Sequence, residues 1–184
     1  MTCLIYYTGV QILITTNCIK MKEREKMKEL GFVGFKTTRD LMGSCNEIPK
    51  DMGIYVVLRE NESEPQFLKE GTGGFFKGQN PNVSLSELKE NWVDDAQVVY
   101  IGKAGGANSS ATLQKRLGQY LRFGQGANIG HWGGRYIWQL ADSKDLVVCW
   151  KTLTDDDPRK IERQMIEDFK TAHGGKRPFA NLKD

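Results

Sequence analysis

Two short apolar segments limit what this chain can fold into. Residues 54–58 (Ile-Tyr-Val-Val-Leu) and residues 97–101 (Gln-Val-Val-Tyr-Ile) are rich in β-branched and aromatic side chains, and glycine or polar residues bound them. This pattern predicts buried β-strands. The fold must therefore include a sheet that contains these two segments.

The rest of the chain adds helices and further strands. Helices are predicted at residues 22–30 and 85–92, and at residues 111–123 between a Ser109-Ser110 cap and Gly124. A last helix is predicted to begin at Pro158, after three aspartates, and to run to about residue 172. Two more strands are predicted at residues 136–140 and 146–150. The mixture indicates the α+β class.

The length of 184 residues suits one domain with a sizeable core. Residues 3–19 carry no charge and are followed by a strongly charged run, which matches neither a signal peptide nor a good membrane helix. We interpret residues 1–34 as an extension, with the functional chain starting at Met21 or Met27, and residues 35–184 as the single domain. Residues 60–96 form an acidic insertion within it.

The cysteines and histidines point to an intracellular protein. The four cysteines form no Cys-x-x-Cys pair and the two histidines lie far apart, so neither a structural zinc site nor a disulfide framework is expected. A reducing, cytoplasmic setting without membrane association is the default expectation.

Charge is distributed unevenly along the chain. Residues 96–140 contain no Asp or Glu but five Lys or Arg residues, whereas residues 60–95 contain eight acids. A basic stretch of this kind fits a surface for a polyanion, because Lys and Arg neutralise phosphates and release counterions. It also fits a loop-rich region that uses Asn, Ser and Gln for solubility.

The glycine-rich segment after the second strand does not match a phosphate-binding loop. Lys103 precedes Gly105 and Gly106, whereas a P-loop needs its lysine after the second glycine, and the dinucleotide fingerprint GxGxxG is absent. What remains is Tyr100 at a strand end, followed closely by Gly102 and Lys103.

Two helices carry polar side chains beside their apolar faces. In the last helix, Glu162 falls within the arc of Ile161, Met165 and Phe169. A carboxylate there is costly unless it binds a metal or pairs with a cation, so it is either a metal ligand or one half of a structural ion pair. In the helix at 111–123, Arg116 and Tyr120 are four residues apart and therefore neighbours.

These elements together resemble the GIY-YIG nucleases. Residues 53–55 and 100–102 are the tripeptides Gly-Ile-Tyr and Tyr-Ile-Gly that name the family, and later elements follow in its order over roughly residues 50–182. Those later elements are Arg116, Tyr120, Glu162 and Asn181. The resemblance implies a small, mostly antiparallel central sheet flanked by helices, with the insertion between the first two core strands.

The resemblance also implies a function, metal-dependent hydrolysis of DNA by an endonuclease. Glu162 would be the only protein ligand of a single Mg²⁺ or Mn²⁺ ion in each active site, and Arg116 would bind the scissile phosphate. Tyr100 would be the general base, assisted by Lys103 and Tyr120. Tyr55 is the other candidate for that role, and Asn181 would fix the geometry of the pocket.

The basic stretch supplies the expected DNA contacts. These residues are Lys103, Lys115, Arg116, Arg122, His131 and Arg135. Phe123, His131, Trp132 and Arg135 could stack bases or could simply pack a loop. A restriction role would suggest a homodimer. The alternative function is a nucleic-acid-binding module that kept the fold and lost or restricted its cleavage activity.

Two spacings depart from the family pattern. Tyr55 and Tyr100 are 45 positions apart, which the acidic insertion accounts for. Glu162 and Asn181 are 19 positions apart, longer than the family pattern leads us to expect, so the role of Asn181 is the weaker assignment.

Overall fold

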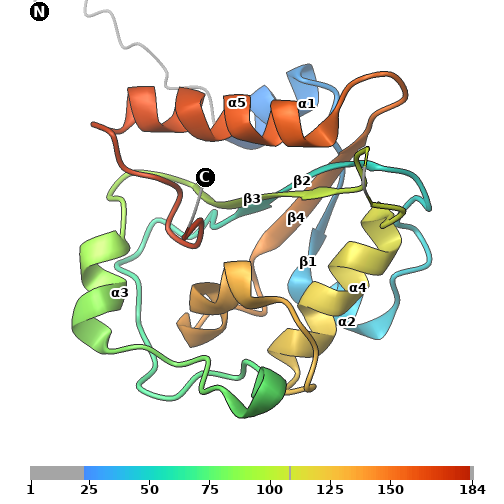
Figure 1. The fold of residues 1–184 in the computed structure, drawn as a ribbon. Coiled ribbons are helices and arrows are strands. Elements are labelled where there is room, and N and C mark those ends of the chain that lie inside the picture. The colour runs from blue at the N-terminus through green and yellow to red at the C-terminus, as the bar shows by residue number, and fades with distance from the viewer. Residues whose placement is uncertain (1–22, 108, 183–184) are drawn as a thin grey trace, which may run out of the picture.

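A four-stranded antiparallel sheet forms the centre of the protein (Figure 1). The computed structural model describes residues 23–107 and 109–182, so the uncharged segment at 3–19 lies outside the described residues. The strands are β1 (Val33–Thr37), β2 (Gly53–Leu58), β3 (Val98–Ala104) and β4 (Val147–Thr152), in the spatial order β1-β4-β2-β3. The predicted α+β class with a small antiparallel sheet is confirmed.

Both segments predicted as buried strands belong to this sheet, and they lie side by side, with β3 at the edge. β2 pairs with β3 on one side and with β4 on the other, and all its residues are buried. The register sets Tyr55 opposite Gly102 and Val57 opposite Tyr100. The two tripeptides of the sequence motif therefore meet in space, although 44 residues separate them along the chain.

Helices cover both faces of the sheet. In Figure 1, α1 (Glu23–Glu29) and α5 (Pro158–Ala172) lie above it, while α3 (Leu85–Asn91) and α4 (Leu113–Gly124) lie below it. Two shorter elements, α2 (Thr38–Gly43) and the 3₁₀ helix η2 (Trp132–Gln139), complete the lower layer. Among the described residues, no helix is long and apolar enough to cross a membrane.

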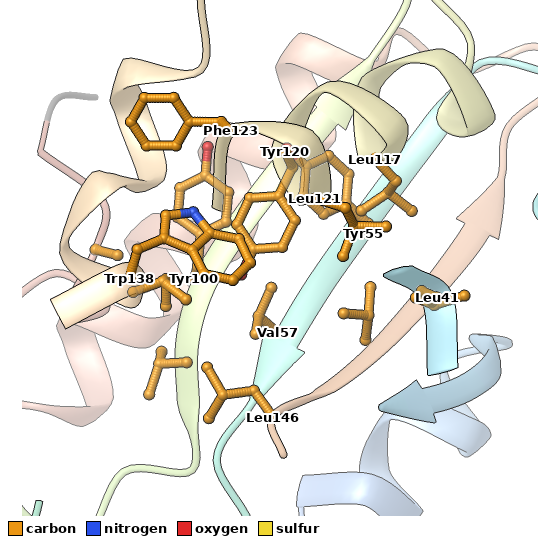
Figure 2. Packing of buried hydrophobic residues seen from close by; sticks show 14 of the residues in the cluster. Leu41, Tyr55, Val57, Tyr100, Leu117, Tyr120, Leu121, Phe123, Trp138 and Leu146 are labelled. Carbon is orange, nitrogen blue, oxygen red and sulfur yellow. The ribbon is translucent and has the colours of Figure 1, made fainter. Parts of the chain in front are cut away.

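The alternation of side chains along β2 divides the core between these two layers. Tyr55 and Val57 point into the lower cluster with Tyr100, Tyr120 and Trp138 (Figure 2). Ile54, Val56 and Leu58 point into the upper cluster, which α1 and α5 cover. A strand buried on both faces accounts for its continuous apolar sequence.

Residues 136–139 of the strand predicted at 136–140 belong to the 3₁₀ helix η2 instead, and Leu140 forms only an isolated antiparallel bridge with Phe67. This prediction was wrong because Tyr136, Ile137 and Trp138 are all buried beneath the sheet. A short apolar run buried on every side has no alternation that would distinguish a strand from a helix. Trp138 packs so closely on Gly124 that a Cβ there would lie 2.3 Å from the indole ring.

The start of the fold lies earlier than the predicted boundary at residues 34 and 35. That boundary falls inside β1, which precedes the two strands taken as the first of the core. Met27 and Phe32, within the predicted extension, are buried in the upper core cluster. The described part of the extension, residues 23–34, is therefore packed into the same body as the sheet.

The insertion is a packed part of the domain. It carries a one-turn 3₁₀ helix, η1 (Phe76–Gly78), and α3, which confirms the helix predicted there. The buried Gln139 of η2 holds the insertion in place through three hydrogen bonds of 2.9–3.1 Å. The side-chain amide of Gln139 donates to the carbonyls of Leu68 and Val83 and accepts from the Val83 amide.

Candidate active site

Gly102 of the Tyr-Ile-Gly tripeptide is needed because Tyr55 of the Gly-Ile-Tyr tripeptide packs against it. Tyr55 lies opposite Gly102 on the paired strands, and its ring crosses the glycine backbone. A Cβ at position 102 would lie 2.4 Å from Cζ of Tyr55 and 2.6 Å from its hydroxyl oxygen. Gly102 thus provides the space in which the Tyr55 side chain lies.

We expect Gly102→Ala to lower the free energy of unfolding by about 1–3 kcal/mol, the usual cost of forcing a side chain into a packed core. Gly118→Ala is the matched control, because a Cβ at Gly118 in α4 meets no atom within 4 Å. That change should raise stability by about 0.5–1 kcal/mol through helix propensity. Urea denaturation measures both, and equal midpoints for the two variants would contradict the close packing of Tyr55 on Gly102.

A cavity of about 290 Å³ lies where β3 ends, between α4 and α5. Its walls come from β2, β3, the loop after β3, and both helices. The lining residues are Tyr55, Tyr100, Lys103, Gly105, Ser109, Ala111, Arg116, Gln119 and Glu162. Five of the residues predicted to be catalytic thus meet at one cavity, although they span more than 100 positions of the chain. They are Tyr55, Tyr100, Lys103, Arg116 and Glu162.

Glu162 faces this cavity as a half-buried carboxylate. Burial raises its pKa, and the positive charges of Lys103, Arg116 and Arg159 act in the opposite direction. Among the described residues Glu162 forms no salt bridge, so the structural ion pair considered from the sequence is absent there. The result is a desolvated carboxylate beside cations that do not neutralise it directly.

Tyr55 and Tyr100 form the floor of the cavity, with ring centroids 5.9 Å apart. Burial raises the pKa of Tyr55 well above 10, and burial also raises the pKa of Tyr100. Arg116 is the main influence lowering the pKa of Tyr100. Lys103, which we expected to favour the Tyr100 phenolate, instead acts on Glu162. Both phenols are thus protonated at neutral pH.

Tyr120 lies behind Tyr100 and does not line the cavity. Its ring is fully buried and stacks on Tyr100, with the centroids 6.5 Å apart and an interplanar angle of 8° (Figure 2). The buried Tyr120 hydroxyl has no hydrogen-bond partner among the described residues, so the hydrogen bond we expected to assist Tyr100 is not formed. Tyr120 contributes aromatic packing that holds the Tyr100 ring.

His131 is an interior residue rather than part of a surface. Its side chain is 1% exposed, and its ring packs edge-on against Tyr120 at 5.2 Å and Tyr100 at 6.4 Å. Burial, with a smaller effect from Arg116, lowers the pKa of His131 to about 3. A neutral, buried imidazole cannot stack a base or bind a phosphate, which corrects the DNA-contact role expected from the sequence.

Asn181 acts on the backbone of β3. Its side-chain oxygen accepts from the Ile101 amide at 2.9 Å, and its side-chain nitrogen donates to the Ile101 carbonyl at 2.8 Å. The Ala180 amide adds a hydrogen bond to the Val99 carbonyl at 2.9 Å. The buried Asn181 therefore covers the free edge of β3 on either side of Tyr100, away from the cavity, and its role is to position that strand.

The remaining basic residues do not line the cavity. Lys115 and Arg122 are exposed on α4, seven residues apart and so on the same side of the helix. Arg135 is half-buried, and its guanidinium lies 4.8 Å from the centroid of the Trp132 ring. This cation–π contact occupies Arg135 within its own segment.

The cavity also contains polar residues that sequence reasoning missed. Gln119 accepts a hydrogen bond from Arg116 Nη1 at 3.4 Å. Its position three residues after Arg116 on one helix could have predicted this contact from the sequence. Ser109 was taken as a helix cap, but the N-cap of α4 is Thr112, whose hydroxyl accepts from the Lys115 amide. Ser109 is thus left to line the cavity.

Comparison of the chain with protein-family models, with curated proteins and with solved structures finds no match in any of the three.

Proposed function

We propose that this protein is a divalent-metal-dependent endonuclease that hydrolyses phosphodiester bonds of DNA. The observation that supports it is the meeting of Tyr55, Tyr100, Lys103, Arg116 and Glu162 at one cavity. This set combines a carboxylate, two cations and two phenols, which can bind a metal ion, bind a phosphate and accept a proton. Its resemblance to the residue set of the GIY-YIG nucleases, in their order along the chain, supports the same conclusion.

The donor set suits a single hard cation. Mg²⁺ in enzymes is usually bound through one or two carboxylates, with waters and substrate phosphates completing its shell. Glu162 is the one carboxylate among the described residues that lines the cavity, so it would be the one protein ligand of such an ion. Its raised pKa and missing salt bridge fit a carboxylate that receives a cation with the substrate. When bound, the ion would supply Lewis-acid polarisation of the scissile phosphate.

The other residues bind the phosphate and move a proton. Arg116 presents a planar guanidinium, oriented by Gln119, that can bind two phosphate oxygens at once. Lys103 adds a second positive charge at the same wall. Tyr100 accepts the proton of the attacking water once its own proton has left, and Arg116 favours that ionised form.

The binding-only alternative is favoured by one observation. Burial raises the pKa of both Tyr55 and Tyr100, so neither phenol is a base at neutral pH in the metal-free protein. A protein with the same cavity could therefore bind a DNA phosphate without cleaving it.

A substrate panel separates these two functions. Duplex, branched and single-stranded DNA are incubated with the protein in Mg²⁺, in Mn²⁺ and in excess chelator. The endonuclease proposal predicts products with either metal and none in chelator. Binding of the same DNA without products in either metal would support the binding module instead.

Binding should depend steeply on salt if the cations of the acid-free stretch at 96–140 neutralise phosphates. With Lys103, Lys115, Arg116 and Arg122 engaged, log K should fall against log salt with a slope of about −3 to −4, because each neutralised phosphate contributes about −0.9 on duplex DNA. Lys115→Ala should make the slope less negative by about 0.9, the contribution of one phosphate. His131→Asn should leave the slope unchanged. Fluorescence anisotropy at several salt concentrations measures the slope, and a flat response would remove the polyanion assignment.

A further inference from the structure

The insertion is acidic at its two ends and basic at its tip. Its acids fall within residues 60–70 and 87–95, whereas residues 71–86 contain none and carry Lys77. We define the insertion tip as residues 74–79, which include η1. The charge of the tip therefore matches the acid-free stretch at 96–140 rather than the rest of the insertion.

The insertion tip is fixed against the end of α4 and the loop that follows it (Figure 1). The Gly74 amide donates to the Phe123 carbonyl at 2.8 Å, and the Lys77 amide donates to the Asn128 side chain at 3.1 Å. Phe76 packs on Gly130, where a Cβ would lie 3.1 Å from the phenyl ring. Two segments without acids are thus joined into one surface.

The two phenylalanines of the tip have different environments. Phe76 is half-buried against the loop, while Phe75 is 53% exposed, one of the largest exposures of an apolar side chain among the described residues. Lys77 beside it is exposed, with Nζ 5.4 Å from the centroid of the Phe76 ring. The insertion tip thus exposes an aromatic ring and a cation two residues apart, a combination that suits bases and phosphates.

This surface is continuous with the candidate active site. At about 1.5 Å per residue, Phe123 lies about 10 Å along α4 from Arg116. The loop after α4 leads back to the cavity floor, because a Cβ at Gly133 would lie 3.4 Å from the Tyr100 hydroxyl oxygen. A distance of 10 Å corresponds to about three base pairs at 3.4 Å per pair.

We propose that the insertion tip is a second DNA contact, at least about three base pairs from the phosphate that is cut. Lys77 binds a backbone phosphate there, and Phe75 stacks on or wedges against the bases. Charge complementarity and continuity with the cavity support DNA as the occupant. The inference rests on the proposed function, since it presumes a DNA phosphate at the cavity.

The test measures affinity in a Glu162→Gln background, so that the DNA stays intact. We expect Phe75→Ala to weaken binding of a 20-base-pair duplex at least about 5-fold, because an aromatic wedge at a base step is lost. Phe75→Trp should restore the affinity, because indole also stacks. The matched control is Leu85→Ala, a similarly exposed apolar residue (40%) of α3 in the same insertion, which should change affinity less than about 2-fold.

Three results would count against the proposal, and they differ in whether the nuclease proposal survives. If the wild-type protein cleaves DNA but Phe75→Ala behaves like Leu85→Ala, the tip contact is wrong and the nuclease stands. If the wild-type protein neither binds nor cleaves DNA, both proposals fall. Loss of affinity in Phe75→Ala without rescue by Phe75→Trp also counts against stacking, provided that both variants keep the wild-type melting temperature.

Discussion

Glu162→Gln should lower the rate of DNA cleavage at saturating Mg²⁺ by about 1000-fold or more. The substitution keeps the size of the side chain and removes the charge of the one carboxylate that lines the cavity among the described residues. Without that carboxylate the metal has no protein ligand, and both its Lewis-acid effect and its orientation of the substrate are lost. Affinity for DNA should persist, because Lys103 and Arg116 remain.

The matched control for this change is Glu167→Gln. Glu167 lies on the same helix but is exposed, where it pairs with Lys170 at 2.8 Å. The Glu167→Gln variant should cleave at the wild-type rate within about 2-fold, because surface substitutions of this kind have small effects. Single-turnover kinetics with labelled duplex compares the two variants. Metal-dependent cleavage by Glu162→Gln at the wild-type rate would remove Glu162 as the ligand.

Tyr100→Phe should lower the cleavage rate about 100- to 10,000-fold, the usual contribution of a general base. Tyr55→Phe should cost less than about 10-fold, because Tyr55 is fully buried and its pKa is raised well above 10. Tyr55 is a weaker influence than Arg116 in lowering the pKa of Tyr100, so loss of its hydroxyl should have only a small effect on the base.

The pH dependence identifies the residue that ionises. Burial raises the pKa of Tyr100 above its usual 10, so the active phenolate becomes about tenfold more populated with each pH unit between 7 and 9. The wild-type rate should rise with pH over that range, and Tyr100→Phe should lose the rise. A larger loss for Tyr55→Phe than for Tyr100→Phe would transfer the base role to Tyr55.

The sequence predicted those parts of the site that follow from local pattern. The two buried strands are β-branched runs, and their glycines mark close approaches of backbone and side chain. Glu162 was identified because a carboxylate within an apolar helical arc is costly, and it does face a cavity as a half-buried group. Such features are encoded within one element and need no knowledge of its neighbours.

The features that were missed depend on contacts between elements. β1 contains Gly34 and Phe35 at positive φ and a bulge against β4, so it has no apolar alternation to recognise. His131 lies in a glycine-rich segment that looks like a surface loop, yet aromatic rings from β3 and α4 bury it. Neither the fold of η2 nor the docking of the insertion tip on α4 is encoded locally, because tertiary packing decides both.

The most direct test of the account is the single-turnover rate of DNA cleavage by the wild-type protein as the Mg²⁺ concentration is raised from zero. A single ion held by Glu162 predicts no product in excess chelator, then a hyperbolic rise to saturation with a Hill coefficient of one. Cleavage that persists in chelator, or no cleavage of any DNA at any Mg²⁺ concentration, would contradict the assignment of this cavity as a metal-dependent nuclease site.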